Sequence, residues 1–162
     1  AFEARDGELF ANGQPFLLRG INWFGSESEL SVPYGLRERS IGDLLDVVTD
    51  SGFNALRLLF NWRSVQANRE TPVPSFRPSL NPELLDDSAA IIAGIPYLAM
   101  LRVLVRKAAE RGLLVLLTNH RLTPTAWPGN GLWYSSEIPE RQVLRNWEVI
   151  SSAFCNEWNV FA

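Results

Sequence analysis

Two nearly continuous apolar runs constrain the fold of this chain most strongly. They cover residues 53–60 and 113–120, the length expected for strands that are buried on both faces. Each run follows a segment that favours a helix, over residues 41–51 and 97–111. Strand and helix therefore alternate, which is the pattern that builds parallel sheets through right-handed crossovers.

Local signals mark the ends of these helices. Apolar residues at positions 41, 44, 45 and 48 have helical spacing, with Ser40 as the expected N-cap and Gly52 as the stop. The second helix closes at Gly112. A third helix is expected to begin at Pro139 and to end near Phe154, since proline is tolerated at a helix start.

The two ends of the chain carry further strand signals. Short apolar runs over residues 2–10 and 16–22 flank an Asn12-Gly13 pair, which is a strong hairpin signal. We predict a hairpin over residues 1–15 and a strand from residue 16. A fourth apolar run over residues 158–162 is expected to begin another strand.

The longer, chemically rich segments follow strands, whereas the turns from helix to strand are tight. Function is therefore expected at the carboxyl ends of the strands, as in doubly wound folds and in (β/α)8 barrels. The first strand lacks a GxGxxG or GxxxxGK[ST] motif after it, which disfavours the nucleotide-binding version. We expect one α/β domain over residues 1–162, with βα units over residues 16–162.

Composition excludes several functions. The chain has 15 Lys and Arg against 18 Asp and Glu, a net charge of −3, so a nucleic-acid partner is not expected. The single cysteine, Cys155, allows neither an intrachain disulfide nor a CxxC zinc site. Uninterrupted apolar runs such as residues 113–117 are too short to span a membrane, and no secretory signal opens the given sequence.

Several short segments together resemble the first half of a glycoside hydrolase family 5 enzyme, one of the cellulase-like (β/α)8 barrels. They are residues 10–16, 19–25, 52–58, 112–117, Asn119-His120-Arg121 and Leu132-Trp133-Tyr134. The resemblance runs from about residue 9 to the end. It implies a parallel α/β fold, the first half of a (β/α)8 barrel whose base is covered by the N-terminal β-hairpin. It implies no metal and no organic cofactor.

The resemblance also shows what the sequence lacks. The family's general acid/base glutamate lies in an Asn-Glu-Pro motif after the fourth strand, and its nucleophilic glutamate follows the seventh. Neither is present. The dipeptide Asn156-Glu157 precedes the fourth apolar run, at the wrong end of that strand, so Glu157 is expected to be a solvated helix terminus. Thr118 and Leu59 stand where the family usually has Asp and Pro.

Two charged residues are the main supporting candidates at the site. Arg57 lies inside an apolar strand, where a guanidinium needs a partner. In the family this arginine orients the nucleophilic glutamate. His120, the sole histidine, ends a buried strand, and its family counterpart binds the sugar in the −1 position. The alternatives are an arginine at an exposed strand end and a histidine with a structural role.

The expected substrate-binding residues are mostly aromatic and follow strands. They are Asn22, Trp23, Trp62, Trp127, Trp133 and Tyr134. An exposed indole is a natural platform for a sugar ring, although each aromatic residue could instead pack its own loop. Glu27 and Glu29 are expected to be solvated loop charges, and Trp147 is expected in the core.

The leading interpretation is a part of a secreted cellulase-like enzyme that cleaves β-linked glucan with retention of configuration. This chain supplies substrate-side residues, and the missing half of the barrel, as a second polypeptide or a remainder of the same one, supplies both glutamates. A half-barrel leaves apolar strand edges open, so something is expected to close it. The alternative is a non-catalytic carbohydrate-binding or structural component of an extracellular assembly.

Overall fold

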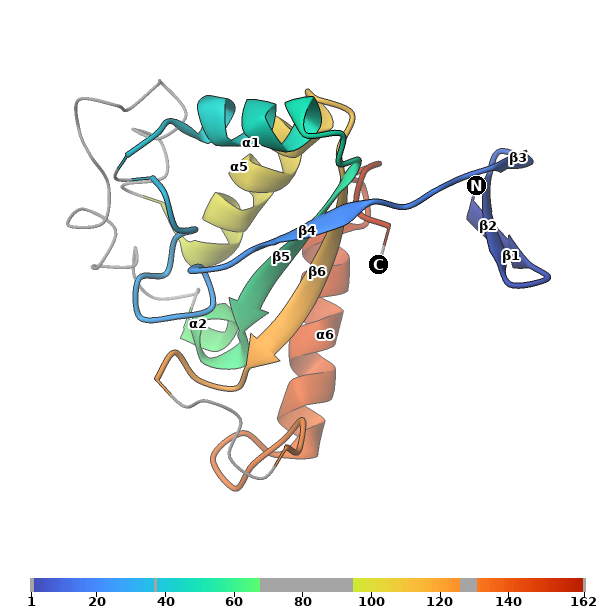
Figure 1. Ribbon diagram of the computed structural model, residues 1–162. Helices are drawn as coiled ribbons and strands as arrows, with labels where there is room; N and C mark the ends of the chain where they lie inside the picture. Colours follow the sequence, from blue (N-terminus) through green and yellow to red (C-terminus); the bar gives the residue numbers. More distant parts are fainter. Residues whose placement is uncertain (1, 37, 68–94, 126–130, 162) are drawn as a thin grey trace.

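The computed structural model describes residues 2–36, 38–67, 95–125 and 131–161. Its centre is a three-stranded parallel sheet in the order β4-β5-β6 (Figure 1). The strands are β4 (Gly20–Trp23), β5 (Ala55–Asn61) and β6 (Leu114–Arg121). The helices are α1 (Ile41–Asp50), α2 (Trp62–Ala67), α5 (Tyr97–Ala109) and α6 (Glu140–Phe154). The predicted α/β class with parallel βα units is confirmed.

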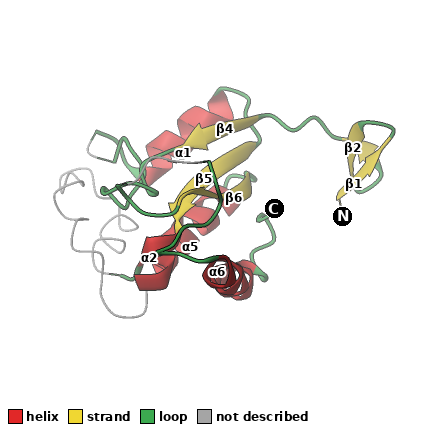
Figure 2. Ribbon diagram, turned by 90° about the horizontal axis from the view of Figure 1, so that it is seen from below, coloured by secondary structure: helices red, strands yellow, loops and turns green. Residues whose placement is uncertain are grey.

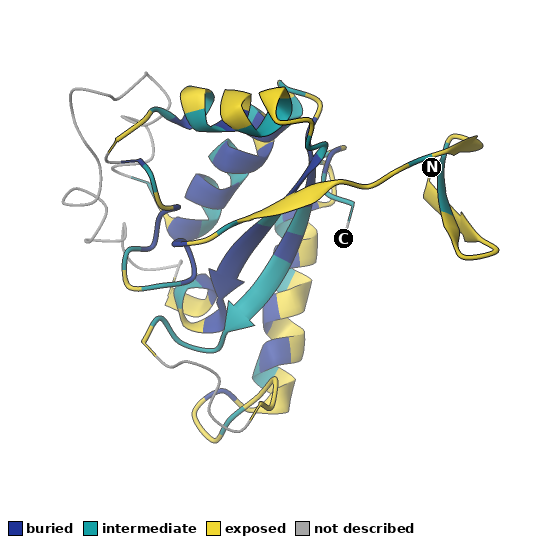
Figure 3. Ribbon diagram, viewed as in Figure 1, coloured by how far each residue is buried: buried dark blue, intermediate teal, exposed yellow. Residues whose placement is uncertain are grey.

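The hydrophobic core lies on the helix-facing side of this sheet. Figures 1 and 2 show α1, α5 and α6 gathered on one face of the strands, and Figure 3 shows the buried residues concentrated there. Alternate residues of β5 and β6 enter this core: Leu56, Leu58, Phe60, Val115 and Leu117. Because strand side chains alternate between faces, the residues between them point to the opposite face of the sheet.

Helix α1 begins and ends where its sequence signals predict. The Ser40 Oγ accepts the Asp43 N–H at 3.0 Å, and an Asp43 carboxylate oxygen accepts the Ser40 N–H at 3.4 Å. This reciprocal pair is a capping box. Gly52 follows the helix at φ +80°, a conformation that glycine adopts without strain.

Replacing Ser40 with alanine is expected to destabilise the fold by about 0.5–2 kcal/mol, because the first turn loses its side-chain acceptor. Urea unfolding of the folded protein measures this free energy. Ser152→Ala is the matched control, since Ser152 is exposed inside α6. Equal midpoints for the two variants would contradict the capping role of Ser40.

The N-terminal segment differs from the predicted single hairpin. Residues 2–15 form an antiparallel meander of β1 (Phe2–Arg5), β2 (Glu8–Ala11) and β3 (Gln14–Pro15). The Asn12-Gly13 turn occurs as predicted but joins β2 to β3. A second turn at Asp6-Gly7, also with positive φ at both residues, precedes it. Figure 1 shows the meander beyond the amino ends of the parallel strands, and the Phe2 ring centroid lies 6.0 Å from that of Phe161.

The first and fourth parallel strands are shorter than predicted. Residues 17–19 precede β4 because the Asn54 side chain holds them: it accepts the Arg19 N–H at 2.7 Å and donates to the Leu17 carbonyl at 2.8 Å. The run expected over 158–162 forms a single parallel bridge between Val160 and Val115. Residue 162 lies outside the described residues.

Candidate active site

A polar row crosses the three parallel strands on the face opposite the core. Arg57 of β5 donates from Nη1 to Asn22 Oδ1 at 3.3 Å and from Nε to Thr118 Oγ1 at 3.2 Å. The strand register places Asn22 directly beside Arg57, and Thr118 beside Leu59. Two neutral acceptors bind these N–H groups but do not balance the guanidinium charge. The row is therefore suited to an anionic partner.

His120 occupies an irregularity in the pairing of β5 with β6. Phe60 pairs with Asn119 and Asn61 pairs with Arg121, so His120 has no counterpart in the register. Such a bulge re-aims a side chain and is common beside active sites. The His120 Nδ1 lies 3.5 Å from Glu27 Oε1. His120 thus lies near the carboxyl end of β6, whereas Arg57 is the third of the seven residues of β5 and lies nearer the amino end of its strand.

Glu27 corrects an expectation from the sequence. It was predicted to be solvated, but its side chain is only 2% exposed and its Oε2 accepts the Gly25 N–H at 2.7 Å. Glu29, two residues later, is exposed as predicted. The sequence alone gave little reason to expect different solvent exposure for Glu27 and Glu29, because the burial of Glu27 depends on contacts with β5 and α5.

Three buried hydrogen bonds hold the loop that carries Glu27. Tyr97 Oη donates to the Ser26 carbonyl at 2.7 Å, Ser26 Oγ donates to the Leu59 carbonyl at 2.6 Å, and Asn61 Nδ2 donates to the Glu27 carbonyl at 3.1 Å. Burial raises the pKa of the Tyr97 phenol, which therefore stays a donor. The loop is fastened to the strand and the helix beneath it.

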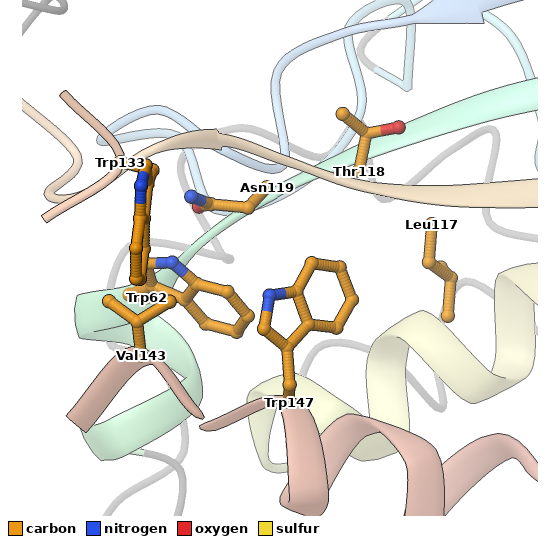
Figure 4. A pocket seen from close by; sticks show the side chains of 7 residues that line it. All are labelled: Trp62, Leu117, Thr118, Asn119, Trp133, Val143 and Trp147. Atoms are coloured by element: carbon orange, nitrogen blue, oxygen red, sulfur yellow. The ribbon is translucent and has the colours of Figure 1, made fainter. Parts of the chain in front are cut away.

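A pocket of about 300 Å³ lies between β6 and α6. Figure 4 shows three indoles around it, from α2, from α6 and from the loop before α6; the lining residues are Trp62, Leu117, Thr118, Asn119, Trp133, Val143 and Trp147. The prediction that Trp62 stands exposed in a loop is wrong, because it begins α2 and is fully buried. Trp147, expected in the core, is 40% exposed.

The other predicted aromatic contacts divide between surface and core. Trp133 and Tyr134 are exposed neighbours with ring centroids 5.2 Å apart in an edge-to-face arrangement. Trp23 instead packs against the hydrophobic core and donates its indole N–H to the Tyr34 carbonyl at 2.9 Å. Its position therefore favours a packing role over the predicted substrate contact. Trp127 lies outside the described residues.

Sequence reasoning missed one exposed aromatic pair. Phe24 and Tyr34 stack with ring centroids 4.6 Å apart, directly after β4, and both are more than half exposed. The pair forms because the Tyr34 N–H donates to the Phe24 carbonyl at 2.8 Å across the intervening loop. A residue separation of ten gave no local signal for this contact.

Glu157 is not the solvated terminus that the sequence suggested. Its side chain is largely buried and lies 2.9 Å from Arg106 Nη2 and 3.7 Å from Arg102 Nε. These contacts raise the pKa of Arg106, mainly through its hydrogen bond to Glu157. The pair ties α5 to the segment after α6, so the role of Glu157 is structural.

The family follows from comparison of the whole chain with known proteins. The model of the family described as Cellulase (glycosyl hydrolase family 5) matches residues 9–162. The chain belongs to this family. The resemblance seen in the sequence is thereby confirmed, and so is the assignment to the first part of a (β/α)8 barrel.

Relatives of this family 5 chain include two proteins named as endoglucanases and one named as an endocellulase. It is 28% identical over 149 residues to an endoglucanase of Paenibacillus polymyxa and 29% identical over 145 residues to the major extracellular endoglucanase of Xanthomonas campestris pv. campestris. A cellotetraose complex of the endocellulase of Pyrococcus horikoshii matches 99% of the chain with a TM-score of 0.80 and 28% identity.

The family 5 chain spans only part of these relatives. Each of the two curated matches covers 90% of this chain, which corresponds to 34% of the Paenibacillus protein and 28% of the Xanthomonas protein. The Pyrococcus structure is covered over 41% of its length. In the described residues of the family 5 chain, no helix is both long and apolar enough for a membrane span, and no three His, Cys, Asp or Glu side chains cluster as metal ligands.

Proposed function

We propose that this chain is the substrate-side part of a secreted endoglucanase that cleaves β-linked glucan with retention of configuration. The observation that carries the proposal is the row of Asn22, Arg57 and Thr118, where a guanidinium has neutral partners on the barrel-facing side of the sheet. The relatives named as endoglucanases support the substrate class, and the one named as extracellular supports secretion.

In this proposal the remaining strands of the barrel, on the same polypeptide or on a second one, supply two glutamates. One protonates the leaving oxygen, and the other, about 5–5.5 Å away, attacks the anomeric carbon. The Arg57 guanidinium holds the attacking carboxylate in its ionised form, because a nearby positive charge favours the charged state of an acid. His120 and Asn22 hydrogen-bond the sugar hydroxyls.

The exposed aromatic residues extend the proposed substrate path. Trp133 and Tyr134 lie beside the pocket at one end of the sheet, and Phe24 with Tyr34 lies after β4. Flat aromatic rings offer rigid apolar area to the faces of pyranose rings. A cello-oligosaccharide is the natural probe, since the Pyrococcus relative was solved with cellotetraose.

Trp133→Ala is expected to weaken cello-oligosaccharide binding by roughly 1–3 kcal/mol, by analogy with bases that stack on aromatic side chains. Calorimetry with cellotetraose on the complete assembly measures this change. Trp158→Ala is the matched control, because Trp158 is 66% exposed and is not among the residues that line the pocket. Unchanged binding in the Trp133 variant would show that this indole only packs its loop.

A second candidate is a non-catalytic carbohydrate-binding or structural component of an extracellular assembly. It is favoured by Thr118, which stands where the family usually has a carboxylate and which contacts Arg57 directly. One experiment distinguishes the two proposals. Cellotetraose hydrolysis by the complete assembly supports the enzyme, whereas binding without hydrolysis supports the second candidate.

A further inference from the structure

We propose that Glu27 is a positioning residue that fixes the tautomer of His120. Its carboxylate is 2% exposed, and its two oxygens face different partners: Oε2 accepts the Gly25 N–H at 2.7 Å, and Oε1 lies 3.5 Å from His120 Nδ1. An ionised carboxylate has no proton, so it accepts hydrogen bonds and cannot donate them. It therefore favours a proton on Nδ1 of the neutral imidazole.

The surroundings make Glu27 a rigid partner. Its backbone carbonyl accepts from the buried Asn61 amide, and the preceding residue, Ser26, is held by Tyr97 and by the Leu59 carbonyl. A group that is locked in this way can orient a neighbouring ring, as carboxylates do for histidines in other active sites. His120 itself sits at the β-bulge, where regular strand pairing does not set its direction.

The consequence concerns the other ring nitrogen. With Nδ1 protonated toward Glu27, Nε2 keeps its lone pair and accepts a hydrogen bond. A sugar hydroxyl is a donor of the required kind. The link to sugar binding rests on the proposed function, whereas the tautomer itself is a property of this chain alone.

Nitrogen NMR of the chain labelled with ¹⁵N-histidine tests the proposal. The sequence contains one histidine, so the spectrum of the 162-residue chain, alone or bound to an unlabelled complement, reports one imidazole. The pH is raised until the signals stop moving, which gives the neutral ring. We expect a pyrrole-like Nδ1 and a pyridine-like Nε2, whereas an unrestrained histidine favours the opposite tautomer. A wild-type ring protonated on Nε2 overturns the proposal without any substitution.

The variant Glu27→Gln is expected to exchange the two signals. Its amide oxygen stays with the Gly25 N–H, so its NH₂ group faces His120 and turns Nδ1 into an acceptor. Glu29→Gln, an exposed neighbour, is the control and is expected to keep the wild-type tautomer. A Glu27→Gln spectrum identical to that of the wild type overturns the positioning role.

The same spectra separate this inference from the proposed function. Cellotetraose is titrated into the labelled chain within the complete assembly. If the wild-type tautomer is as expected but the His120 signals do not respond to saturating cellotetraose, sugar binding by His120 fails while its positioning by Glu27 stands. If they respond but Nε2 carries the proton, the positioning fails while sugar binding stands.

Discussion

Hydrolysis of a soluble cello-oligosaccharide is expected to be absent from the 162-residue chain alone and to appear when the remaining strands of the barrel are supplied. Retaining hydrolysis needs two carboxyl groups on either side of the scissile bond. Among the described residues, two carboxylates near the sheet are already engaged: Glu27 is 2% exposed and bound to the Gly25 N–H, and Glu157 is held by Arg102 and Arg106. Neither is available to attack or to protonate a glycan.

The measurement is reducing-sugar release from cellotetraose by the pure chain, with and without a polypeptide that contains the missing βα units. Arg57→Ala in the complemented sample is the specificity control, and it should lose most of the restored activity because the attacking carboxylate loses its cationic neighbour. Turnover by the isolated chain that disappears when one of its own carboxylates is replaced would refute this expectation.

Gly25→Ala is expected to destabilise the protein by roughly 3 kcal/mol or more. Gly25 has φ +121°, and a Cβ there would lie 2.6 Å from both the Tyr34 nitrogen and the Val32 carbonyl oxygen. Both obstacles are backbone atoms, which cannot rotate away. The turn must open, and the Gly25 N–H that holds Glu27 must move with it.

Gly52→Ala is the matched comparison for this prediction. Gly52 also has positive φ, at +80°, but a Cβ there meets nothing within 4 Å. Its cost is the conformational strain alone, about 1–2 kcal/mol. Chemical denaturation measures the loss of unfolding free energy in each variant, and the difference between the two losses is the cost of the steric clash at Gly25. An equal loss in both would show that the loop at Gly25 relaxes freely.

Sequence patterns predicted the elements that local chemistry determines. The ends of α1 follow from Ser40 and Gly52, and the buried strands follow from continuous apolar runs, so each was placed within a residue or two. The errors arose where distant contacts decide. The Asn54 side chain shortens the first parallel strand, and the sequence near residues 17–19 carries no signal that predicts this contact.

The site was predictable in part for the same reason. Arg57 and His120 stood out because a charged residue or a lone histidine at a buried strand is chemically conspicuous. Their neighbours in the structure come from segments far along the chain: Asn22 and Thr118 beside Arg57, and Glu27 beside His120. Glu27 looks like any loop carboxylate until the buried contacts of its loop with Leu59, Asn61 and Tyr97 are known.

The placement of the core on the helix-facing side bears on how the protein is made. The members of that core come from this chain, so we expect it to form as soon as α6 has left the ribosome. Under the proposed function, the barrel-facing side is completed only when the remaining strands are added. During that interval the exposed Leu17 and Leu18, just before the edge strand β4, and the exposed Ile21 within it are sites for mispairing. We therefore expect a chaperone to matter most at this stage of synthesis.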